Sequence, residues 1–410
     1  MRFVSTAALI AAFAVCGDAR SCTETDVVIL GAGMAGVTAA ETLERHSVND
    51  FIVLEYQDRI GGRMFEVTFG KALQYVIEAG ANWVHGTGGP ETHENPVWTL
   101  VRLNRHSLLQ HRVLMTTDVE NVTIYDQTGE IPSETLFAAL EAVSDADAKV
   151  LADAGIRLHH NLEDRTYRAA LRRQGWNPRK SNQGNLRNLY RGNHQCHCKR
   201  GFSTILRNEA GPLFEGQNAR RLRTNTVVNE IAQDRFSVTV HSTDGECVRA
   251  KYAITTFSLD PVERGYYPLF QPLDLPGVLE GSNILIATVV NEEAYRVEQQ
   301  SEAETRSEIM EVLRKMFKDK DVPDPVDIYY ARWTQEPWSY GSYSNWPPGV
   351  SARTHRHLRE NVGRVLFAGE ATSPQFSGFL HGAYYEGKRA AESIASCLRG
   401  PRWDDCDFSK

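Results

Sequence analysis

The chain has 410 residues, of which 41% are hydrophobic and 24% are charged, a composition typical of a globular protein. This length suggests two domains, which can be interwoven along the sequence. The 45 lysines and arginines against 52 acidic residues give a formal net charge of −7, so nothing in the total charge favours a nucleic-acid partner.

The N-terminal residues have the pattern of a secretory signal peptide. Arg2 supplies the positive start, residues 3–15 form an apolar core, and small residues surround a cleavage point after Ala19. This core is shorter than the roughly 20 residues that a membrane span needs, and no later stretch is long enough. We therefore predict a signal peptide at residues 1–19, a secreted protein and no membrane span.

Export implies an oxidising compartment, where cysteines form disulfides. After removal of the signal, the remaining cysteines are Cys22, Cys196, Cys198, Cys247, Cys397 and Cys406. Cys397 and Cys406 are near neighbours that could pair, while the other pairings stay open. Residues 194–198 crowd two histidines and two cysteines together without a second cluster at a finger-like distance, so we predict no metal site.

The stretch from Asp26 to Glu55 carries the strongest signal. An apolar run at 27–30 leads into Gly31-Ala32-Gly33-Met34-Ala35-Gly36, an Ala-rich helical segment and a second apolar run that ends on Glu55. This order predicts strand, tight turn, helix and strand, which is the βαβ unit of dinucleotide-binding proteins. An ordinary βαβ unit with a glycine turn is the alternative.

Each part of this unit has an expected role. Gly31 permits the turn, Gly33 lets the backbone approach a pyrophosphate, and Gly36 lets the helix pack close to the strand. The helix start at Met34 and Ala35 offers free N–H groups to the phosphates. Glu55 lies close to the position, about 20 residues beyond the glycines, where an acid bonds the ribose hydroxyls. At this point both FAD and NAD remain open as cofactors.

Two further motifs follow. Arg59 and Arg63 flank Gly61-Gly62, a pattern suited to a second phosphate-facing turn because the glycines allow close approach and the guanidiniums add charge. The block Gly80-Ala81-Asn82-Trp83 comes next, with His85 two residues later. With these motifs the chain resembles the flavin-containing amine oxidases, most closely the secreted polyamine oxidases, and the resemblance implies FAD.

The C-terminal part strengthens this resemblance. Residues 365–372 read as a strand ending at Gly369 and Glu370, and Ser377 to Ala383 leads into a helix from Tyr384 to Cys397. In the family, this helix start points at the flavin N1–C2=O edge, where negative charge collects on reduction. The cofactor-binding residues that the resemblance implies are Gly31, Gly33, Met34, Ala35, Gly36, Glu55, Arg59, Gly62, Arg63, Gly80, Ala81, Asn82, Trp83, Val228 (through its backbone to the adenine), Trp338, Gly369, Glu370, Gly378, Phe379 and Leu380.

The resemblance also implies the fold, which is α/β. A discontinuous, Rossmann-like FAD-binding domain comprises residues 23–105, 197–258 and 360–400. It is interwoven with a substrate domain of mixed sheet and helices at residues 106–196 and 259–359. We expect a monomer.

The implied activity is FAD-dependent oxidation of a polyamine of the spermine and spermidine class. In the family, a hydride passes from the carbon beside the amine nitrogen to flavin N5, and O2 reoxidises the flavin. The products are H2O2, an aldehyde and a shorter amine. Tyr343 and Phe379 correspond to the two walls of an aromatic slot that holds cationic amines by cation–π contact. His85 stands where relatives carry His or Glu near the substrate, so the implied catalytic residues are His85, Tyr343 and Phe379.

The chain departs from the family on the substrate side. A long family block has no counterpart between Leu259 and Asp260, and with it goes the lysine that bonds through water to flavin N5. The basic stretch at 172–200 stands where the family has a longer, more apolar segment. A deletion through a sheet also predicts exposed apolar edges and poor solubility. Two alternatives therefore stay open: a catalytically impaired FAD-binding relic, and an amine oxidase redirected to a specialised metabolite.

Overall fold

The computed structural model describes residues 22–71, 73–86, 88, 94–103, 123, 125–126, 129–163, 167–176, 201–256, 265–275, 279–290, 292–345, 349–400 and 406. The predicted signal peptide, the His- and Cys-containing stretch at 194–198 and the junction after Leu259 lie outside these residues.

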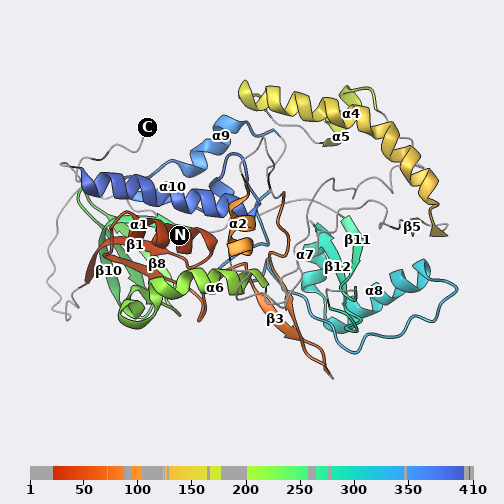
Figure 1. The fold of residues 1–410 in the computed structure, drawn as a ribbon, viewed down its shortest axis with the longest axis horizontal. Coiled ribbons are helices and arrows are strands. Elements are labelled where there is room, and N and C mark those ends of the chain that lie inside the picture. The colour runs from red at the N-terminus through yellow and green to blue at the C-terminus, as the bar shows by residue number, and fades with distance from the viewer. Residues whose placement is uncertain are drawn as a thin grey trace, which may run out of the picture.

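The predicted βαβ unit is confirmed. Strand β1 (Thr23–Leu30) leads into helix α1 (Met34–Arg45), which returns to strand β2 (Phe51–Leu54). The main sheet has the order β7-β2-β1-β10-β9-β8, and β13 also pairs with β10. Its other strands are β7 (Leu222–Arg223), β8 (Val228–Gln233), β9 (Val238–Ser242), β10 (Cys247–Thr255) and β13 (Val365–Phe367). All contacts among β7, β2, β1, β10 and β13 are parallel, whereas β8 and β9 run antiparallel (Figure 1).

The central strands β1 and β2 are buried on both faces over most of their length. Val27 and Ile29 of β1 pack with α1, with α6 (Gly201–Phe214) and with α10 (Leu380–Arg399). Val28 and Leu30 face the other way, against residues of β9 and β10. Successive side chains of a strand point to opposite faces, so burial on both faces requires the continuous apolar run that the sequence has here.

Helix α10 begins earlier than the sequence predicts, at Leu380 instead of Tyr384. Glycine lowers helix propensity, so Gly382 is an unfavourable residue for the first turn of a helix. The structure gives that glycine a packing role, because a Cβ there would lie 2.1 Å from the Phe376 carbonyl oxygen. Helix α10 also lies directly on α1, where a Cβ at Gly387 would lie 2.1 Å from the Ala35 carbonyl oxygen.

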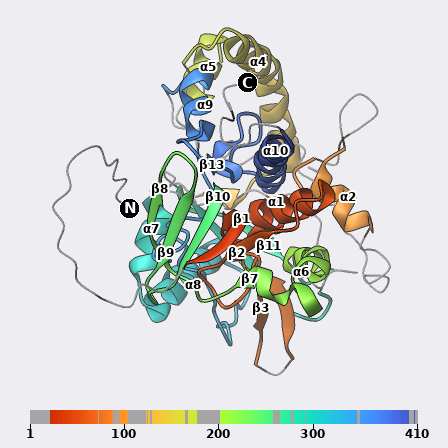
Figure 2. The same cartoon turned by 90° about the vertical axis from the view of Figure 1, so that its left-hand side faces the viewer.

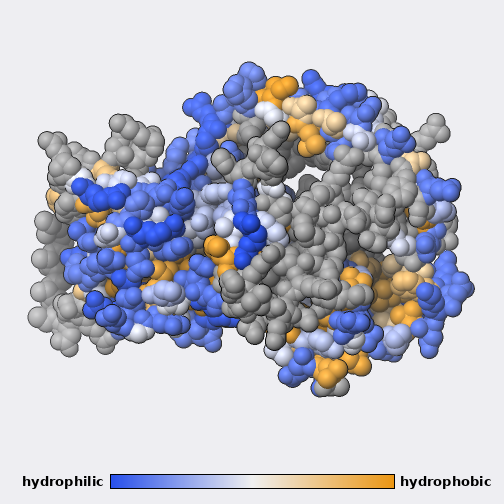
Figure 3. Space-filling model, viewed as in Figure 1, coloured by the Kyte–Doolittle hydropathy of each residue, from blue (hydrophilic) through white to orange (hydrophobic). Residues whose placement is uncertain are grey.

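A second unit contains strands β11 (Gly265–Pro272) and β12 (Leu285–Val290) and helices α7 (Glu292–Gln299) and α8 (Glu302–Met316). The sequence Ser301-Glu302-Ala303-Glu304 predicts a capping box at the start of a helix, and the structure confirms it at the start of α8. The apolar run at 284–290 predicts a buried strand over residues 283–291. The strand is present, but the predicted burial is wrong, since β12 is half-buried and Leu285 is 44% exposed. Among the described residues β12 pairs only with β11, so fewer neighbours cover it. Figure 3 shows apolar surface over this unit, on the right of the view.

The remaining elements surround these two units. They are the hairpin β3 (Glu66–Phe69) and β4 (Tyr75–Glu78), α2 (Pro96–Leu103), the short hairpin β5 (Tyr125–Asp126) and β6 (Gly129–Glu130), α4 (Ser133–His159), α5 (Tyr167–Arg173), α9 (Ala352–Arg356) and the 3-10 turns η3 (Gly216–Arg221), η4 (His357–Arg359) and η5 (Glu370–Thr372). Helices α4 and α5 lie beyond α9, away from the main sheet (Figure 2).

Two disulfides link described residues. Cys397 pairs with Cys406, as their spacing suggested, and Cys22 pairs with Cys247, which the sequence left open. The second bond joins the starts of the neighbouring strands β1 and β10. Within the described part of the chain, every helix is too short or too polar to cross a membrane.

Candidate active site

The two predicted phosphate-facing turns lie side by side at the carboxyl end of β1. The Gly61 N–H donates to the Ala32 carbonyl oxygen at 2.9 Å, and a Cβ on Gly62 would lie 3.6 Å from the Gly33 Cα. Gly61 and Gly62 both have positive φ, at 118° and 56°, which only glycine adopts readily. The fold therefore brings Gly31 and Gly33 of the first turn next to Gly61 and Gly62 of the second, at one end of the sheet.

The first turn is as tight as the motif requires. Gly31 has φ of 109°, and a Cβ on Gly36 would lie 1.9 Å from the Gly31 carbonyl oxygen. Gly33 is the N-cap of α1 and has no side chain with which to cap it. The first-turn N–H groups of a helix have no partners within the helix, so this end of α1, with Met34 and Ala35, is suited to the pyrophosphate of a dinucleotide.

Glu55 is buried at the end of β2, next to this turn. Its Oε2 accepts the Ala32 N–H at 2.6 Å, and its Oε1 accepts the Gln57 N–H at 2.9 Å. Burial raises the pKa of the carboxyl, and these hydrogen bonds oppose the rise. The Thr226 N–H donates to the Glu55 carbonyl oxygen at 2.8 Å, which places the start of β8 and Val228 beside the acid. The predicted ribose and adenine contacts thus lie at one place, although their roles stay predictions.

Arg59 bonds the backbone of its own turn in the structure, and its role at the cofactor stays a prediction. Its guanidinium donates to the carbonyl oxygens of Ile60, Gly62 and Met64 in its own turn, and lies 4.3 Å from the centre of the Phe65 ring. A tight turn leaves such carbonyls without backbone partners, and a guanidinium with five N–H donors satisfies several at once. Arg59 therefore stabilises the Gly-Gly turn in this structure.

Arg63, the Gly80 block and Glu370 meet at a second place. The Arg63 guanidinium lies 2.9 Å from Glu370 Oε1 and donates to the Ser342 carbonyl oxygen at 3.1 Å. The Ala81 N–H donates to the Arg63 carbonyl oxygen, and a Cβ on Gly80 would lie 1.9 Å from that oxygen. The rest of the block, Asn82 and Trp83, is half-buried.

Glu370 is buried, with 6% of its surface exposed, directly after Gly369, which has φ of 126°. Its Oε1 accepts the N–H and the Oγ–H of Ser344, and its Oε2 accepts the Gly378 N–H at 2.7 Å. The sequence predicts a cofactor bond for this residue. In the structure both side-chain oxygens accept hydrogen bonds from the protein, and the bond to the cofactor stays a prediction.

The predicted aromatic residues lie close to these contacts. Tyr343 is 48% exposed and Phe379 is 36% exposed, as walls of an open site would be. A Cβ on Gly378 would lie 3.7 Å from the Tyr343 ring, so the two aromatic segments touch. Trp338 lies edge-on to Trp333, and its ring N–H donates to Glu336. Leu380 is the first residue of α10.

His85 belongs to a cluster that the sequence only partly predicts. Its ring lies edge-on to Phe379 at 4.8 Å, and His381 stacks on the same Phe379 ring at 5.4 Å. Burial lowers the pKa of His85, and burial together with the nearby His85 lowers the pKa of His381 to about 4. Both imidazoles are therefore neutral at neutral pH, and Phe379 lies between them.

Asn95 and His381 are site residues that the sequence analysis missed. Asn95 Nδ2 donates to the carbonyl oxygens of His85 and Gly86 and lies 3.4 Å from His381 Nδ1, while its Oδ1 accepts the Val97 N–H at the start of α2. An Asn before Pro96 is a recognisable helix cap, but only the fold brings it to His85. His381 follows Phe379 by two residues, which was the available signal.

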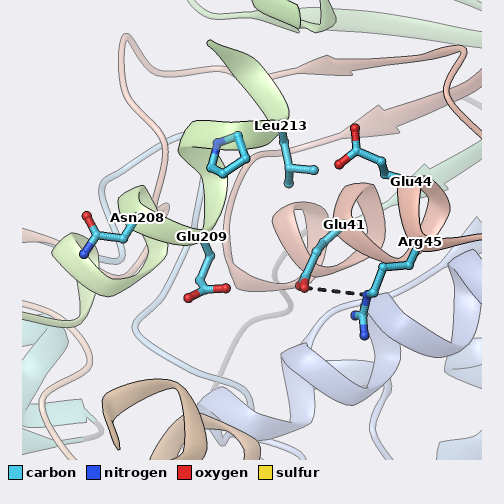
Figure 4. A pocket seen from close by; sticks show the side chains of 7 residues that line it. Glu41, Glu44, Arg45, Asn208, Glu209 and Leu213 are labelled. Atoms are coloured by element: carbon cyan, nitrogen blue, oxygen red, sulfur yellow. Dashed lines mark ion pairs between the residues drawn. The ribbon is translucent and has the colours of Figure 1, made fainter. Parts of the chain in front are cut away.

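A cavity of about 320 Å³ lies elsewhere, between α1 and α6 (Figure 4). Glu41, Glu44, Arg45 and Glu209 line it, and burial raises the pKa of Glu41. Glu41, Glu44 and Arg45 lie on the C-terminal half of α1, away from the glycine turns at its start, and Glu209 lies on α6. In the described part of the chain, no cluster of His, Cys, Asp and Glu is arranged to hold a metal ion.

Comparison with known proteins gives the family. A model of the flavin containing amine oxidoreductase family matches residues 34–180, 129–280 and 278–395. The chain belongs to the flavin-containing amine oxidase family. Members of this family contain a flavin. The dinucleotide-binding unit, with no side chain capping the start of α1, fits FAD. FAD is therefore the cofactor, and amine oxidation is the class of activity.

Individual relatives agree with this assignment. Polyamine oxidase 1 of Zea mays is 29% identical over 460 aligned residues, which cover 91% of each chain. Lysine-specific histone demethylase 1 homolog 1 of Arabidopsis thaliana is 38% identical, over 34% of this chain. The solved structure of wild-type putrescine oxidase bound to putrescine covers 92% of this chain with a TM-score of 0.63. At 17% identity, that last similarity shows the fold alone.

Proposed function

We propose that this chain oxidises a polyamine of the spermine and spermidine class, with O2 as the co-substrate and H2O2, an aldehyde and a shorter amine as products. Two kinds of observation support the proposal. The relatives that align over nearly the whole chain include polyamine oxidases of maize and rice. The site also presents exposed aromatic rings, at Tyr343 and Phe379, to which a cationic chain can bind.

The observation that carries the proposal is the meeting of three distant segments. Arg63 from the second glycine turn, Ser344 beside Tyr343, and Gly378 beside Phe379 all bond one buried carboxylate, that of Glu370. Bound FAD supplies the hydride acceptor for the C–H bond beside the amine nitrogen. Such a transfer requires the phosphate-facing turns and the aromatic rings to lie close together, and these contacts support that arrangement.

The residues of the site control the charge of the substrate. An amine must be neutral to release a hydride, and an apolar slot disfavours the ammonium form. The neutral imidazole of His85, in contact with Phe379, is placed to accept a proton from the amine or to anchor it. A further amine of a polyamine can remain cationic and lie over an aromatic face.

The experiment measures peroxide release with spermine and spermidine beside the visible absorbance of the purified protein. Yellow protein that releases peroxide with either amine supports the proposal. Yellow protein that is inactive on polyamines but oxidises another amine supports redirection to a different substrate. Yellow protein without turnover on any amine contradicts the proposed activity and favours the impaired relic.

The relic is kept as a second candidate because of a specific observation. The alignment with the maize polyamine oxidase spans 460 positions, whereas 91% of 410 residues is about 373, so about 87 positions of the relative have no counterpart here. We infer that the gap includes the block after Leu259 and the lysine that bonds through water to flavin N5. Its loss is expected to slow turnover more than cofactor binding.

We also propose that the protein is secreted as a monomer, with residues 1–19 removed. The disulfides Cys22–Cys247 and Cys397–Cys406 support this location, because such bonds persist in oxidising compartments. The domain boundaries given above remain part of the proposal. N-terminal sequencing of protein from the medium of expressing cells tests the secretion and the removal of residues 1–19. A chain that stays in the cells and begins at Met1 would contradict it.

A further inference from the structure

The carboxylate of Glu370 bridges the two segments that carry the aromatic rings. Its Oε1 accepts the N–H of Ser344 at 3.1 Å and the Ser344 hydroxyl at 2.8 Å. Its Oε2 accepts the N–H of Gly378 at 2.7 Å. Ser344 directly follows Tyr343, and Gly378 directly precedes Phe379, so one rigid group holds the backbone next to each ring.

The bridge is short and leaves little slack. Gly378 has φ of 85°, and a Cβ there would lie 2.8 Å from the Ser344 carbonyl oxygen. The side chain of Glu370 is only 7% exposed, so water does not compete freely for its oxygens. Hydrogen bonds from backbone N–H groups to a buried carboxylate are among the stronger ones in proteins.

Arg63 holds the residue that precedes Tyr343 in the sequence, whereas Glu370 holds the residue that follows it. Its guanidinium lies 2.9 Å from Glu370 Oε1 and also donates to the carbonyl oxygen of Ser342. The peptide groups before and after Tyr343 are therefore both held, the first by Arg63 and the second by Glu370. The ion pair also offsets the cost of burying a lone carboxylate.

We propose that Glu370, together with Arg63, is a positioning residue that fixes the separation of the Tyr343 and Phe379 rings and so sets the width of the amine slot. The inference rests on the proposed function, because it concerns the slot of that site. This positioning task is additional to the cofactor bond expected for Glu370, which stays a prediction. A fixed separation of the two rings would select substrates by their width, because such a gap admits a slender alkyl amine better than a bulky aryl amine.

Two variants separate the span of the carboxylate from its charge. Glu370→Gln keeps the length but turns one acceptor into a donor, while Glu370→Asp keeps the charge but is one methylene shorter. Hydrogen exchange at the amides of residues 344 and 378, followed by mass spectrometry on peptides covering 342–345 and 376–379, reads the bridge directly. Glu308→Gln is the matched control, because it breaks a two-point ion pair with Arg296 between α7 and α8.

We expect slow exchange at both amides in the wild type and exchange at least about tenfold faster in both Glu370 variants, as for loss of a charge-assisted hydrogen bond. The control should change neither amide. If the protein is active, the ratio of kcat/KM for spermidine to kcat/KM for benzylamine should be about tenfold lower in the Glu370 variants than in the wild type. We expect the decrease to come mainly from a higher KM for spermidine, with a smaller change in kcat.

Three results would overturn the inference. They are fast exchange at either amide in the wild type, unchanged exchange in Glu370→Gln, or wild-type behaviour of Glu370→Asp, which would make charge alone sufficient. If neither variant folds, the wild-type exchange rates still decide. Failure of the proposed function would show differently, as absence of peroxide from wild-type protein, and leaves the exchange result readable.

Discussion

The two units of this molecule differ in how firmly their residues are held. In the main sheet, Val27, Ile29 and Ile254 are fully buried, and three helices cover one face. In the second unit, β12 is half-buried, and Val326 is 73% exposed. The first unit carries the glycine turns for FAD, and the second carries much of the predicted substrate side. From this difference we expect that loss of cofactor binding and loss of turnover can occur separately in this chain.

The largest effect is expected at Gly36, on the side of the main sheet. Gly36→Ala places a Cβ 1.9 Å from the Gly31 carbonyl oxygen, which belongs to backbone and cannot move aside cheaply. We expect a loss of stability of about 3 kcal/mol or more and no retained FAD, measured by thermal unfolding and by flavin absorbance.

Gly155→Ala in α4 is the control for that change. Nothing lies within 4 Å of a Cβ there, so a gain of up to about 1 kcal/mol is expected from helix propensity. Yellow, stable Gly36→Ala protein would show that the tight first turn is not needed for the cofactor.

The next effect concerns the slot between the units. Phe379→Ala removes the ring that lies between His85 and His381. We expect kcat/KM for spermidine to fall about 100-fold with FAD retained, because orientation of the substrate is lost while the phosphate-facing turns remain. Phe236→Ala, which removes an exposed ring far along the chain, should leave kcat/KM unchanged. Equal losses in both variants would argue against a specific slot.

A pH experiment contrasts two acids, Glu78 in the β3–β4 hairpin and Glu304 in α8. Burial raises the pKa of Glu78 from 4.5 to about 7, and its Oε2 is buried without a hydrogen-bond partner. The folded state then keeps a proton that the unfolded state releases, so this residue costs stability as pH rises from about 4.5 to 7. Glu78→Gln should be more stable than wild type at pH 8, by on the order of 1–3 kcal/mol, and equal to it below pH 4.5.

Glu304 should give the opposite sign. Hydrogen bonds from Ser301 lower its pKa, so its contribution is present above the unfolded pKa and is lost as pH falls. Glu304→Gln should therefore be less stable than wild type at pH 8. Urea unfolding at pH 4 and pH 8 measures both variants, and the same sign in both would contradict the assignment of the shifts.

The smallest effect on stability is expected at Val326. Val326→Ser replaces an exposed apolar side chain and should change stability by less than about 0.5 kcal/mol while raising the soluble yield. Val28→Ser in β1, which is fully buried, should abolish soluble protein. Light scattering after purification gives the comparison. Unchanged aggregation in Val326→Ser would mean that this exposed side chain does not limit solubility.

The sequence was sufficient where local pattern and function coincide. The βαβ unit was predicted from the apolar run of β1, the glycines of its turn and the spacing of Glu55 from those glycines. The start of α8 was predicted from the capping box at Ser301. These features depend on neighbours along the chain. The start of α10 was predicted too late, because the need for Gly382 comes from contact with Phe376.

Long-range contacts could not be predicted in the same way. The two oxygens of Glu370 bond residues 26 and 8 positions away, and the ion pair with Arg63 spans 307 positions. The role of Asn95 beside His381 likewise exists only once α2 and α10 are packed. The sequence identified Arg63, Glu370 and Phe379 as members of one site, but the bonds of Glu370 to Arg63, Ser344 and Gly378 exist only in the fold.

The central claim is that the two glycine turns and the start of α1 hold FAD. The most direct test is titration of FAD into purified chain freed of cofactor, followed by flavin fluorescence and visible absorbance, with Gly36→Ala beside it. The account predicts saturable binding of one FAD per wild-type chain and none by the variant. A folded, monodisperse wild-type chain that stays colourless at saturating FAD would contradict it.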